Sequence, residues 1–165
     1  MGLLSTSSNA RAENELLDLL VVQDEVVTLL ESLHKAQPIQ PRLYSFFKRN
    51  NVKRPEYFAS LIAKHPMPNH KKKLIAAMLV VESHGDTKAV SRKGAQGILQ
   101  IMPFWKKVLK IKGSLKDPVV NLDAGSRVYD IHLKEANGNQ RKGLIAYSGG
   151  SKWYPNKISD LVKQI

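Results

Sequence analysis

The feature that most constrains the fold is an apolar run in the middle of the chain, KKKLIAAMLVVES over residues 71–83. No polar or charged side chain interrupts the stretch from Leu74 to Val81, and alanine, leucine and methionine are strong helix formers. A run of this kind predicts a helix that is buried on nearly every side and therefore needs other helices packed around it. Gly85 stands where such a helix is expected to end.

Shorter helical patterns surround this run, and strand signals are few. Pro55 suits a first helical turn, whereas Pro38 and Pro41 interrupt a helical pattern because proline cannot continue a helix. Asn121 is expected to be the N-cap of a helix that continues to about residue 135. The fold class is therefore predicted to be predominantly α, with little or no β-sheet. The helices expected besides the central one cover residues 42–49, 55–64, 104–110, 121–135, 142–147 and 156–165.

The N-terminal part differs from the rest in pattern and in charge. Apolar residues recur at three- and four-residue steps over residues 13–34, which predicts one amphipathic helix with an acidic opposite side. The segment His65–Asn69 is rich in proline and is expected to be a connector. We therefore expect an N-terminal helical extension, residues 1–68, followed by a second domain, residues 69–165. The apolar side of the first helix requires a partner, which is either the rest of this chain or another protein.

The remainder of the chain is strongly basic. Lysine and arginine outnumber aspartate and glutamate by 26 to 14, which gives a net charge of +12, although residues 1–40 are acidic on balance. This charge favours an anionic partner, such as nucleic acid, a lipid surface or an acidic cell-wall polymer, and solubility alone is the alternative. Nucleic acid is not expected, because no nucleic-acid motif or aromatic stacking series is present. No transmembrane segment or typical signal peptide is visible, although a leader removed earlier would leave the same sequence.

Glu82 directly follows the apolar run, so its side chain is expected against an apolar wall. Burial raises the pKa of a carboxyl group, as a general acid working near neutral pH requires; a glutamate at a solvated helix end is the alternative. Three ordered segments favour the first interpretation: Glu82-Ser83, AVSRKGAQGILQIMP over 89–103, and AYSGG over 146–150. They closely resemble the soluble lytic transglycosylases, which belong with goose-type lysozymes in the lysozyme-like superfamily.

The resemblance implies a lysozyme-like helical domain that cleaves peptidoglycan glycan strands between N-acetylmuramic acid and N-acetylglucosamine, leaving an anhydro-muramyl end. Glu82 corresponds to the single catalytic acid/base of the family. Ser148 departs from the pattern, since the family usually has asparagine there. The implied location is the cell envelope, in the periplasm or outside the cell, or a phage particle. The positions that match saccharide-binding, groove-lining or carboxylate-flanking residues of the family are Ser91, Gln100, Met102 and Tyr147.

Two other functions fit the same sequence. A goose-type muramidase would hydrolyse the bond on the same fold, and a non-enzymatic module would use the basic surface for binding. Most glycosidases need two carboxylates, yet no acidic residue after Glu82 falls in a matched motif. No metal or cofactor is expected, because the five histidines show no His-Glu-x-x-His pattern and no phosphate-binding loop occurs. Ser83, His84 and Asp86 form no hydrolytic triad, since no Gly-x-Ser-x-Gly elbow accompanies them.

Overall fold

The computed structural model describes residues 16–17, 19–23, 25–27 and 38–165. Residues 39–165 form one compact unit, and residues 1–38 are a separate one. The described residues between 16 and 27 are helical and their side chains are exposed. The rest of the helix predicted over 13–34 lies outside the described residues. The expected boundary at residue 68 falls inside the compact unit.

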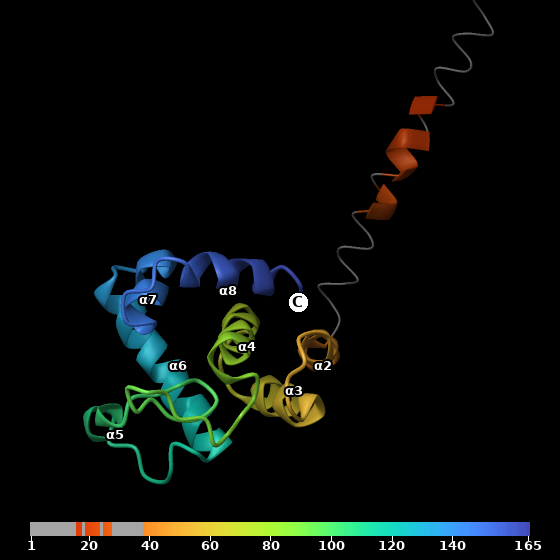
Figure 1. The fold of residues 1–165 in the computed structure, drawn as a ribbon. Helices are drawn as coiled ribbons and strands as arrows, with labels where there is room; N and C mark the ends of the chain where they lie inside the picture. The colour runs from red at the N-terminus through yellow and green to blue at the C-terminus, as the bar shows by residue number, and fades with distance from the viewer. Residues whose placement is uncertain (1–15, 18, 24, 28–37) are drawn as a thin grey trace, which may run out of the picture. The chain divides into compact units, whose positions relative to one another are not determined.

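The compact unit consists of helices joined by turns and one long loop (Figure 1). Among the described residues there is no strand, only isolated bridges from Gln96 to Val90 and to Ile101. The predicted, mainly helical class is therefore confirmed. None of the described helices is long and apolar enough to span a bilayer. The helices are α2 (Ile39–Arg49), α3 (Pro55–Lys64), α4 (Asn69–Ser83), α5 (Phe104–Val108), α6 (Pro118–Glu135), α7 (Gln140–Tyr147) and α8 (Tyr154–Val162).

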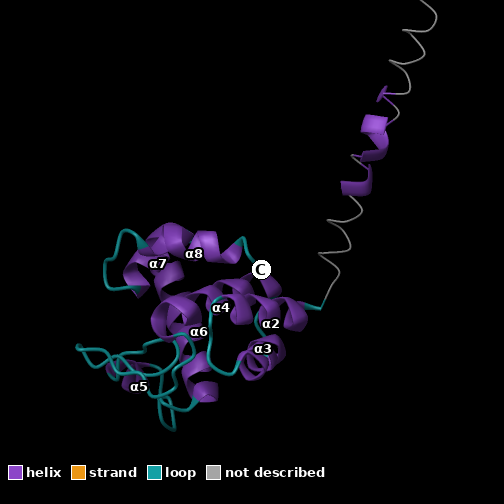
Figure 2. Cartoon of the chain, turned by 45° about the vertical axis from the view of Figure 1, so that its right-hand side comes forward, coloured by secondary structure: helices purple, strands orange, loops and turns teal. Residues whose placement is uncertain are grey.

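The apolar run forms α4, the buried helix that its sequence predicts. Residues 74–80 are at most 5% exposed, and α2, α3 and α8 all contact this helix. Figures 1 and 2 show α4 in the interior of the compact unit, with α8 on one side of it and α2 and α3 on another. The helix ends at Ser83 and is capped by His84, which has a left-handed backbone and donates its amide to the carbonyls of Leu79 and Val80. This end directs Glu82 toward the loop that follows.

The helices α2 and α3 belong to the same core as α4 and α8. Phe46 and Phe47 of α2 and Phe58 of α3 are completely buried in it. The C-terminus is fastened to α2 as well, because Arg42 donates to the carbonyl oxygen of Ile165 at 2.8 Å. The predicted interruption at Pro41 is wrong: α2 begins at Ile39, and Pro41 lies in the first turn, where a helix needs no amide donor.

Asn121 is not the N-cap that its sequence position predicts. The cap of α6 is Asp117, whose carboxylate accepts hydrogen bonds from the amides of residues 119 and 120. Asn121 lies one turn inside the helix and is fully buried. Its side chain accepts from the amide of Leu99 at 2.8 Å and donates to the carbonyls of Gln96 and Leu115 at 2.8 and 2.7 Å. It therefore ties the loop that follows α4 to α6.

Candidate active site

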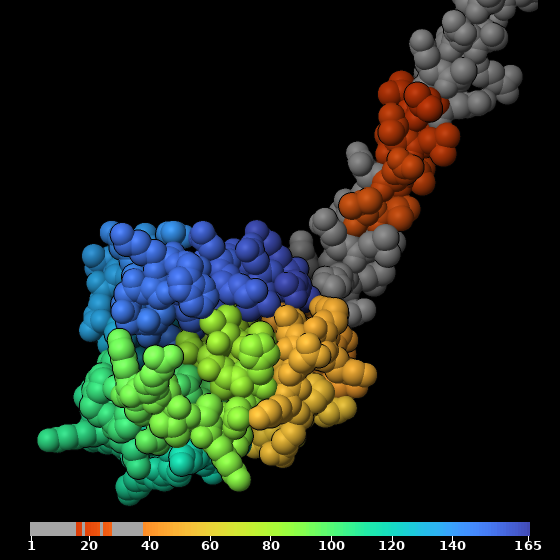
Figure 3. Space-filling view, viewed as in Figure 1, coloured from red at the N-terminus to blue at the C-terminus, as the bar shows by residue number. Residues whose placement is uncertain are grey.

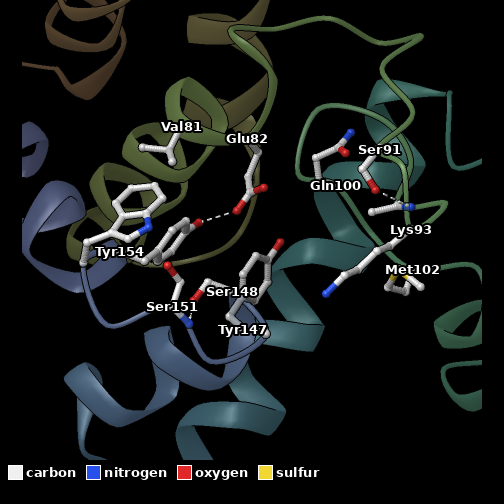
Figure 4. Close-up of a pocket in the computed structure, with 13 residues that line it drawn as sticks. Val81, Glu82, Ser91, Lys93, Gln100, Met102, Tyr147, Ser148, Ser151 and Tyr154 are labelled. Carbon is white, nitrogen blue, oxygen red and sulfur yellow. Dashed lines mark hydrogen bonds between the residues drawn. The ribbon is translucent and has the colours of Figure 1, made fainter.

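A cleft of about 460 Å³ opens where the end of α4 meets the loop over residues 85–103 and the turn between α7 and α8 (Figure 4). In Figure 3 the C-terminal residues (blue) and the residues that follow α4 (light green) adjoin on the viewed face of the compact unit. The cleft brings together all five residues singled out from the sequence. Its lining consists of Val81, Glu82, Ser91, Lys93, Ala95, Gln100, Met102, Tyr147, Ser148, Gly149, Ser151, Trp153 and Tyr154.

Glu82 lies at the last turn of α4 and is partly buried in the cleft wall. Its Oε1 atom accepts a hydrogen bond of 2.6 Å from the hydroxyl of Tyr154, drawn as a dashed line in Figure 4. Burial raises the pKa of this carboxyl above its ordinary value, and the hydrogen bond from Tyr154 opposes that shift in part. The group is thus held toward its protonated form.

Two tyrosines pack beside this carboxyl group. The rings of Tyr147 and Tyr154 are stacked, with centroids 6.5 Å apart. The hydroxyl of Tyr147 donates to the carbonyl of Leu99 at 2.8 Å rather than to Glu82. Burial is the main cause that raises the pKa of both phenols, so each stays a neutral hydrogen-bond donor. Tyr147 therefore fastens the loop to α7, while Tyr154 orients the carboxyl group.

The loop side of the cleft is organised by short polar side chains. Ser91 accepts a hydrogen bond from the amide of Ala95 at 3.0 Å, which closes a turn. The side-chain nitrogen Nε2 of Gln100 donates to the carbonyl of Gly97 at 2.9 Å. The described residues offer no partner to its side-chain oxygen Oε1. Figure 4 shows Ser91, Gln100 and Met102 on the loop side, and all three belong to the lining of the cleft. Their arrangement leaves hydrogen-bonding atoms beside an apolar thioether.

Among the described residues, Glu82 supplies the single carboxylate of the cleft lining. Asp86, the next acid along the chain, forms an ion pair of 2.8 Å with Lys53 and accepts the amide of Lys88, so its contacts lie outside the lining. No group of three acidic, histidine or cysteine side chains in the described part of the chain could hold a metal ion. The chemistry available from the described lining is therefore that of one carboxyl group with hydroxyl and amide neighbours and one ammonium group, that of Lys93.

The structure adds residues that the motifs did not single out, chiefly Tyr154, Trp153 and Lys93. Tyr154 begins α8, two residues before the predicted start of that helix. Pro155, which favours a first helical turn, was the available signal for the earlier start. Ser148 closes the adjoining turn: its hydroxyl donates to the carbonyl of Ile145 at 3.0 Å and accepts the amide of residue 151 at 3.3 Å.

Comparison with known proteins identifies the class to which this fold and cleft belong. Residues 60–160 match the family model of the transglycosylase SLT domain. Because this match covers more than half of the chain, the chain belongs to the SLT domain family. The resemblance to lytic transglycosylases inferred from the motifs is thereby confirmed.

Two relatives carry corresponding names. A stretch of 91 residues is 40% identical to the membrane-bound lytic murein transglycosylase E of Buchnera aphidicola subsp. Baizongia pistaciae (strain Bp), over 48% of this chain and 43% of that protein. A stretch of 95 residues is 30% identical to the transglycosylase of Enterobacteria phage PRD1, over 52% of this chain and 35% of that protein. The matched region thus spans less than half the length of either relative.

A solved structure is also similar. It is the complex of the 70-kDa soluble lytic transglycosylase with bulgecin A, which matches with a TM-score of 0.49 and 22% identity, over 73% of this chain and 20% of that chain.

Proposed function

We propose that this chain is a peptidoglycan lytic transglycosylase that uses Glu82 as its single general acid and base. The observation that carries the proposal is the setting of this carboxyl group. Glu82 lies in the wall of a cleft, its pKa is raised by burial, and a 2.6 Å hydrogen bond from Tyr154 holds one of its oxygens. A carboxyl group whose protonated form is favoured by burial, next to an open groove, suits protonation of a glycosidic oxygen.

The reaction begins with proton transfer from Glu82 to the oxygen between N-acetylmuramic acid and N-acetylglucosamine. As the glycosidic bond breaks, the N-acetyl oxygen of the muramyl residue attacks the anomeric carbon and takes the place of an enzyme nucleophile. Glu82, now ionised, accepts the proton of the muramyl C6 hydroxyl. That oxygen forms a bond to the anomeric carbon and displaces the N-acetyl oxygen, which closes the anhydro ring. One proton leaves the carboxyl group and one returns, and no water is consumed.

Tyr154 acts as a positioning residue in this scheme. Its hydroxyl donates to Oε1 of Glu82, so Oε2 is the oxygen that remains available to carry the proton. The burial of Tyr154, which is 2% exposed, keeps this arrangement fixed. A preoriented acid loses little entropy when the substrate arrives, and orientation of this kind accounts for a large share of enzymatic rate enhancement.

The number of carboxylates favours the lytic reaction over hydrolysis. Inverting and retaining glycosidases generally use a second carboxylate as base or nucleophile. The described part of the cleft lining offers no second one, whereas a reaction assisted by the substrate's own N-acetyl group requires none. A goose-type muramidase is the competing function, and its products differ by one water.

The neighbouring residues are assigned to substrate binding. Ser91 and Gln100 offer hydrogen-bonding atoms to sugar hydroxyl and acetamido groups, and Met102 offers an apolar contact. Tyr147 supports the loop through Leu99. Each such hydrogen bond contributes about 1 kcal/mol. The 69–165 segment would supply the catalytic residues, and the natural setting is the cell envelope or a phage particle that meets the cell wall.

The test replaces the acid alone. E82Q keeps the size and hydrogen-bonding capacity of the side chain but cannot donate the acid proton, so the release of muropeptides from purified sacculi should fall by about 10²–10⁴-fold or more. Binding of the variant to sacculi should persist. E56Q serves as the matched control, because Glu56 is exposed in the first turn of α3 and lies outside the cleft. Near wild-type release by E82Q would refute the assignment of the acid.

A further inference from the structure

The turn between α7 and α8 carries a large aromatic side chain that the proposed reaction does not use. Trp153 is 60% exposed, although it belongs to the lining of the cleft. Tryptophan side chains of folded proteins are highly buried on average, and an exposed indole beside a groove offers a large apolar area that a ligand can cover. The rest of the cleft indicates which class of ligand would cover this ring.

The backbone that carries the indole is held by hydrogen bonds of the preceding turn and by the buried residue that follows it. The turn before it is closed by two hydrogen bonds, from the amide of Gly150 to the carbonyl of Ile145 at 2.8 Å and from the amide of Ser151 to the hydroxyl of Ser148 at 3.3 Å. The next residue, Tyr154, is buried, and its ring centroid lies 5.8 Å from that of the indole. The turn thus fixes the backbone position of Trp153, and the ring of Tyr154 supports one part of the indole, which lowers the ordering cost of a binding contact.

The two sides of the cleft differ in chemistry. The loop side presents Ser91, Lys93 and Gln100, and Figure 4 shows these polar side chains across the cleft from Tyr154. The other side presents the indole of Trp153 next to that tyrosine. A hexopyranose ring has the same division, because its hydroxyl and acetamido groups lie at the edge while C–H groups cover its faces. A sugar placed between the two sides can satisfy both.

We propose that Trp153 forms a saccharide-stacking subsite, in which the indole covers the C–H face of an N-acetylhexosamine ring of the glycan strand. The ring it holds neighbours the bond that Glu82 cleaves, since Tyr154 both adjoins the indole and donates to that carboxyl group. The proposal rests on the proposed function and adds a subsite to it. The subsite contributes to affinity for uncharged sugar rings and has no part in proton transfer.

The test uses a neutral saccharide and a protein that cannot cleave it. Oligomers of N-acetylglucosamine are titrated into the full chain carrying E82Q, and tryptophan emission is recorded. The chain has two tryptophans, and the second, Trp105, lies outside the cleft lining. A change in emission with E82Q that is absent with E82Q/W153F would therefore come from Trp153. We expect such a change, together with a loss of affinity of about 3–10-fold in E82Q/W153A, the size of one aromatic contact.

A conservative variant and a check of folding complete the experiment. E82Q/W153Y should retain most of the affinity, because a smaller aromatic face still covers the sugar, which separates stacking from general support of the turn. Far-ultraviolet circular dichroism checks that each variant is folded. Unchanged affinity in E82Q/W153A, or unchanged Trp153 emission of E82Q at saturating saccharide, would overturn the proposal.

Failure of the proposed function would give a different pattern. In that case the unsubstituted chain would release no muropeptides from sacculi, while E82Q still showed the Trp153-dependent emission change. The subsite would then stand as a sugar-binding feature without the lytic reaction. The reverse pattern, cleavage without any contribution of Trp153, would remove the subsite and leave the reaction.

Discussion

At the scale of single residues, the pKa of Glu82 governs the expected pH dependence. A general acid works in its protonated form, and burial raises the pKa of this carboxyl. The protonated fraction therefore persists to a higher pH than for an ordinary glutamate and is lost as the pH rises through the raised pKa. We expect the rate of muropeptide release to fall on that alkaline side, above the pH at which an exposed glutamate titrates. A rate that increases through this range would contradict the assignment.

The hydrogen bond from Tyr154 provides a sharper test of the same pKa. This bond opposes the effect of burial on Glu82, so Y154F should raise the pKa further and move the alkaline limb of the pH–rate profile to higher pH. The maximal rate should fall as well, because Oε1 loses its fixed partner. Y147F is the comparison variant, since the Tyr147 hydroxyl bonds to Leu99 instead. A limb that shifts equally in both variants would argue against a direct effect of Tyr154.

What the sequence could predict at this scale follows from how each residue is recognised. Glu82, Ser91 and Gln100 lie in contiguous motifs, so the sequence alone was enough to identify them. In the structure all three line one cleft. Tyr154 and Trp153 lie outside the quoted motifs, on a turn whose path depends on the hydroxyl of Ser148. Their proximity to the carboxyl group arises from tertiary packing of α8 on α4, which no local pattern encodes.

At the scale of elements, the loop between α4 and α5 depends on α6 for its shape. The side chain of Asn121 satisfies one backbone amide and two backbone carbonyls of residues 96–115. Gly97 is required by the same contact, because it has a φ of +75° and a Cβ added there would lie 2.4 Å from the Asn121 amide. The cleft wall is thus built by helix-to-loop hydrogen bonds rather than by a sheet.

We therefore expect N121A to be strongly destabilising. The substitution leaves two buried backbone groups, the amide of Leu99 and the carbonyl of Leu115, without partners, each at a cost of about 1–3 kcal/mol. The carbonyl of Gln96 keeps its hydrogen bond from the amide of Ile101. The free energy of unfolding should therefore fall by at least about 2 kcal/mol. Urea denaturation measures this change. N156A is the control, because Asn156 is exposed in α8 and accepts a single surface hydrogen bond from Arg141. Equal stability of the two variants would show that Asn121 does not organise the loop.

At this scale too, local sequence patterns were predictable and tertiary contacts were not. The 3.6-residue pattern and prolines predicted all the helices of the compact unit, and uninterrupted apolar residues identified α4 as buried. The ends were less accurate. The sequence indicated Asn121 as the cap of α6, whereas the cap is Asp117 and the side chain of Asn121 is taken up by buried partners. Such partners lie far away in sequence and become known only from the fold.

At the scale of the whole molecule, charge distribution is the feature with a functional consequence. Residues 41–165 hold 24 of the 26 basic and 8 of the 14 acidic side chains. Four aspartates pair with lysine or arginine, Asp86, Asp123, Asp130 and Asp160. Most of the positive charge in this part of the chain is therefore uncompensated and available to an anionic surface.

We expect binding to intact sacculi to weaken as salt rises, because exposed charges are screened over about 10 Å at 0.1 M ionic strength. Sedimentation of E82Q with sacculi at increasing sodium chloride measures this. Oligomers of N-acetylglucosamine carry no charge, so their affinity should change little over the same range and provides the control. Sacculus binding that is independent of salt would remove any role for the basic surface in substrate capture.

The division of the chain into units also belongs to this scale. The core that contains α4 includes Phe46 and Phe58, from α2 and α3, and the compact unit begins at Ile39. The division at residue 68 was predicted from prolines in the connector, which mark a turn but carry no information on which helices share a core. A role for the N-terminal helix in binding another protein remains a prediction.

The central claim is that one carboxyl group drives an intramolecular cyclisation of the sugar. Mass spectrometry of the muropeptides released from purified sacculi tests it most directly. The account predicts products that end in anhydro-muramyl residues, each lighter by one water than its hydrolytic counterpart. Products that carry only reducing muramyl ends would contradict it and identify the chain as a hydrolase.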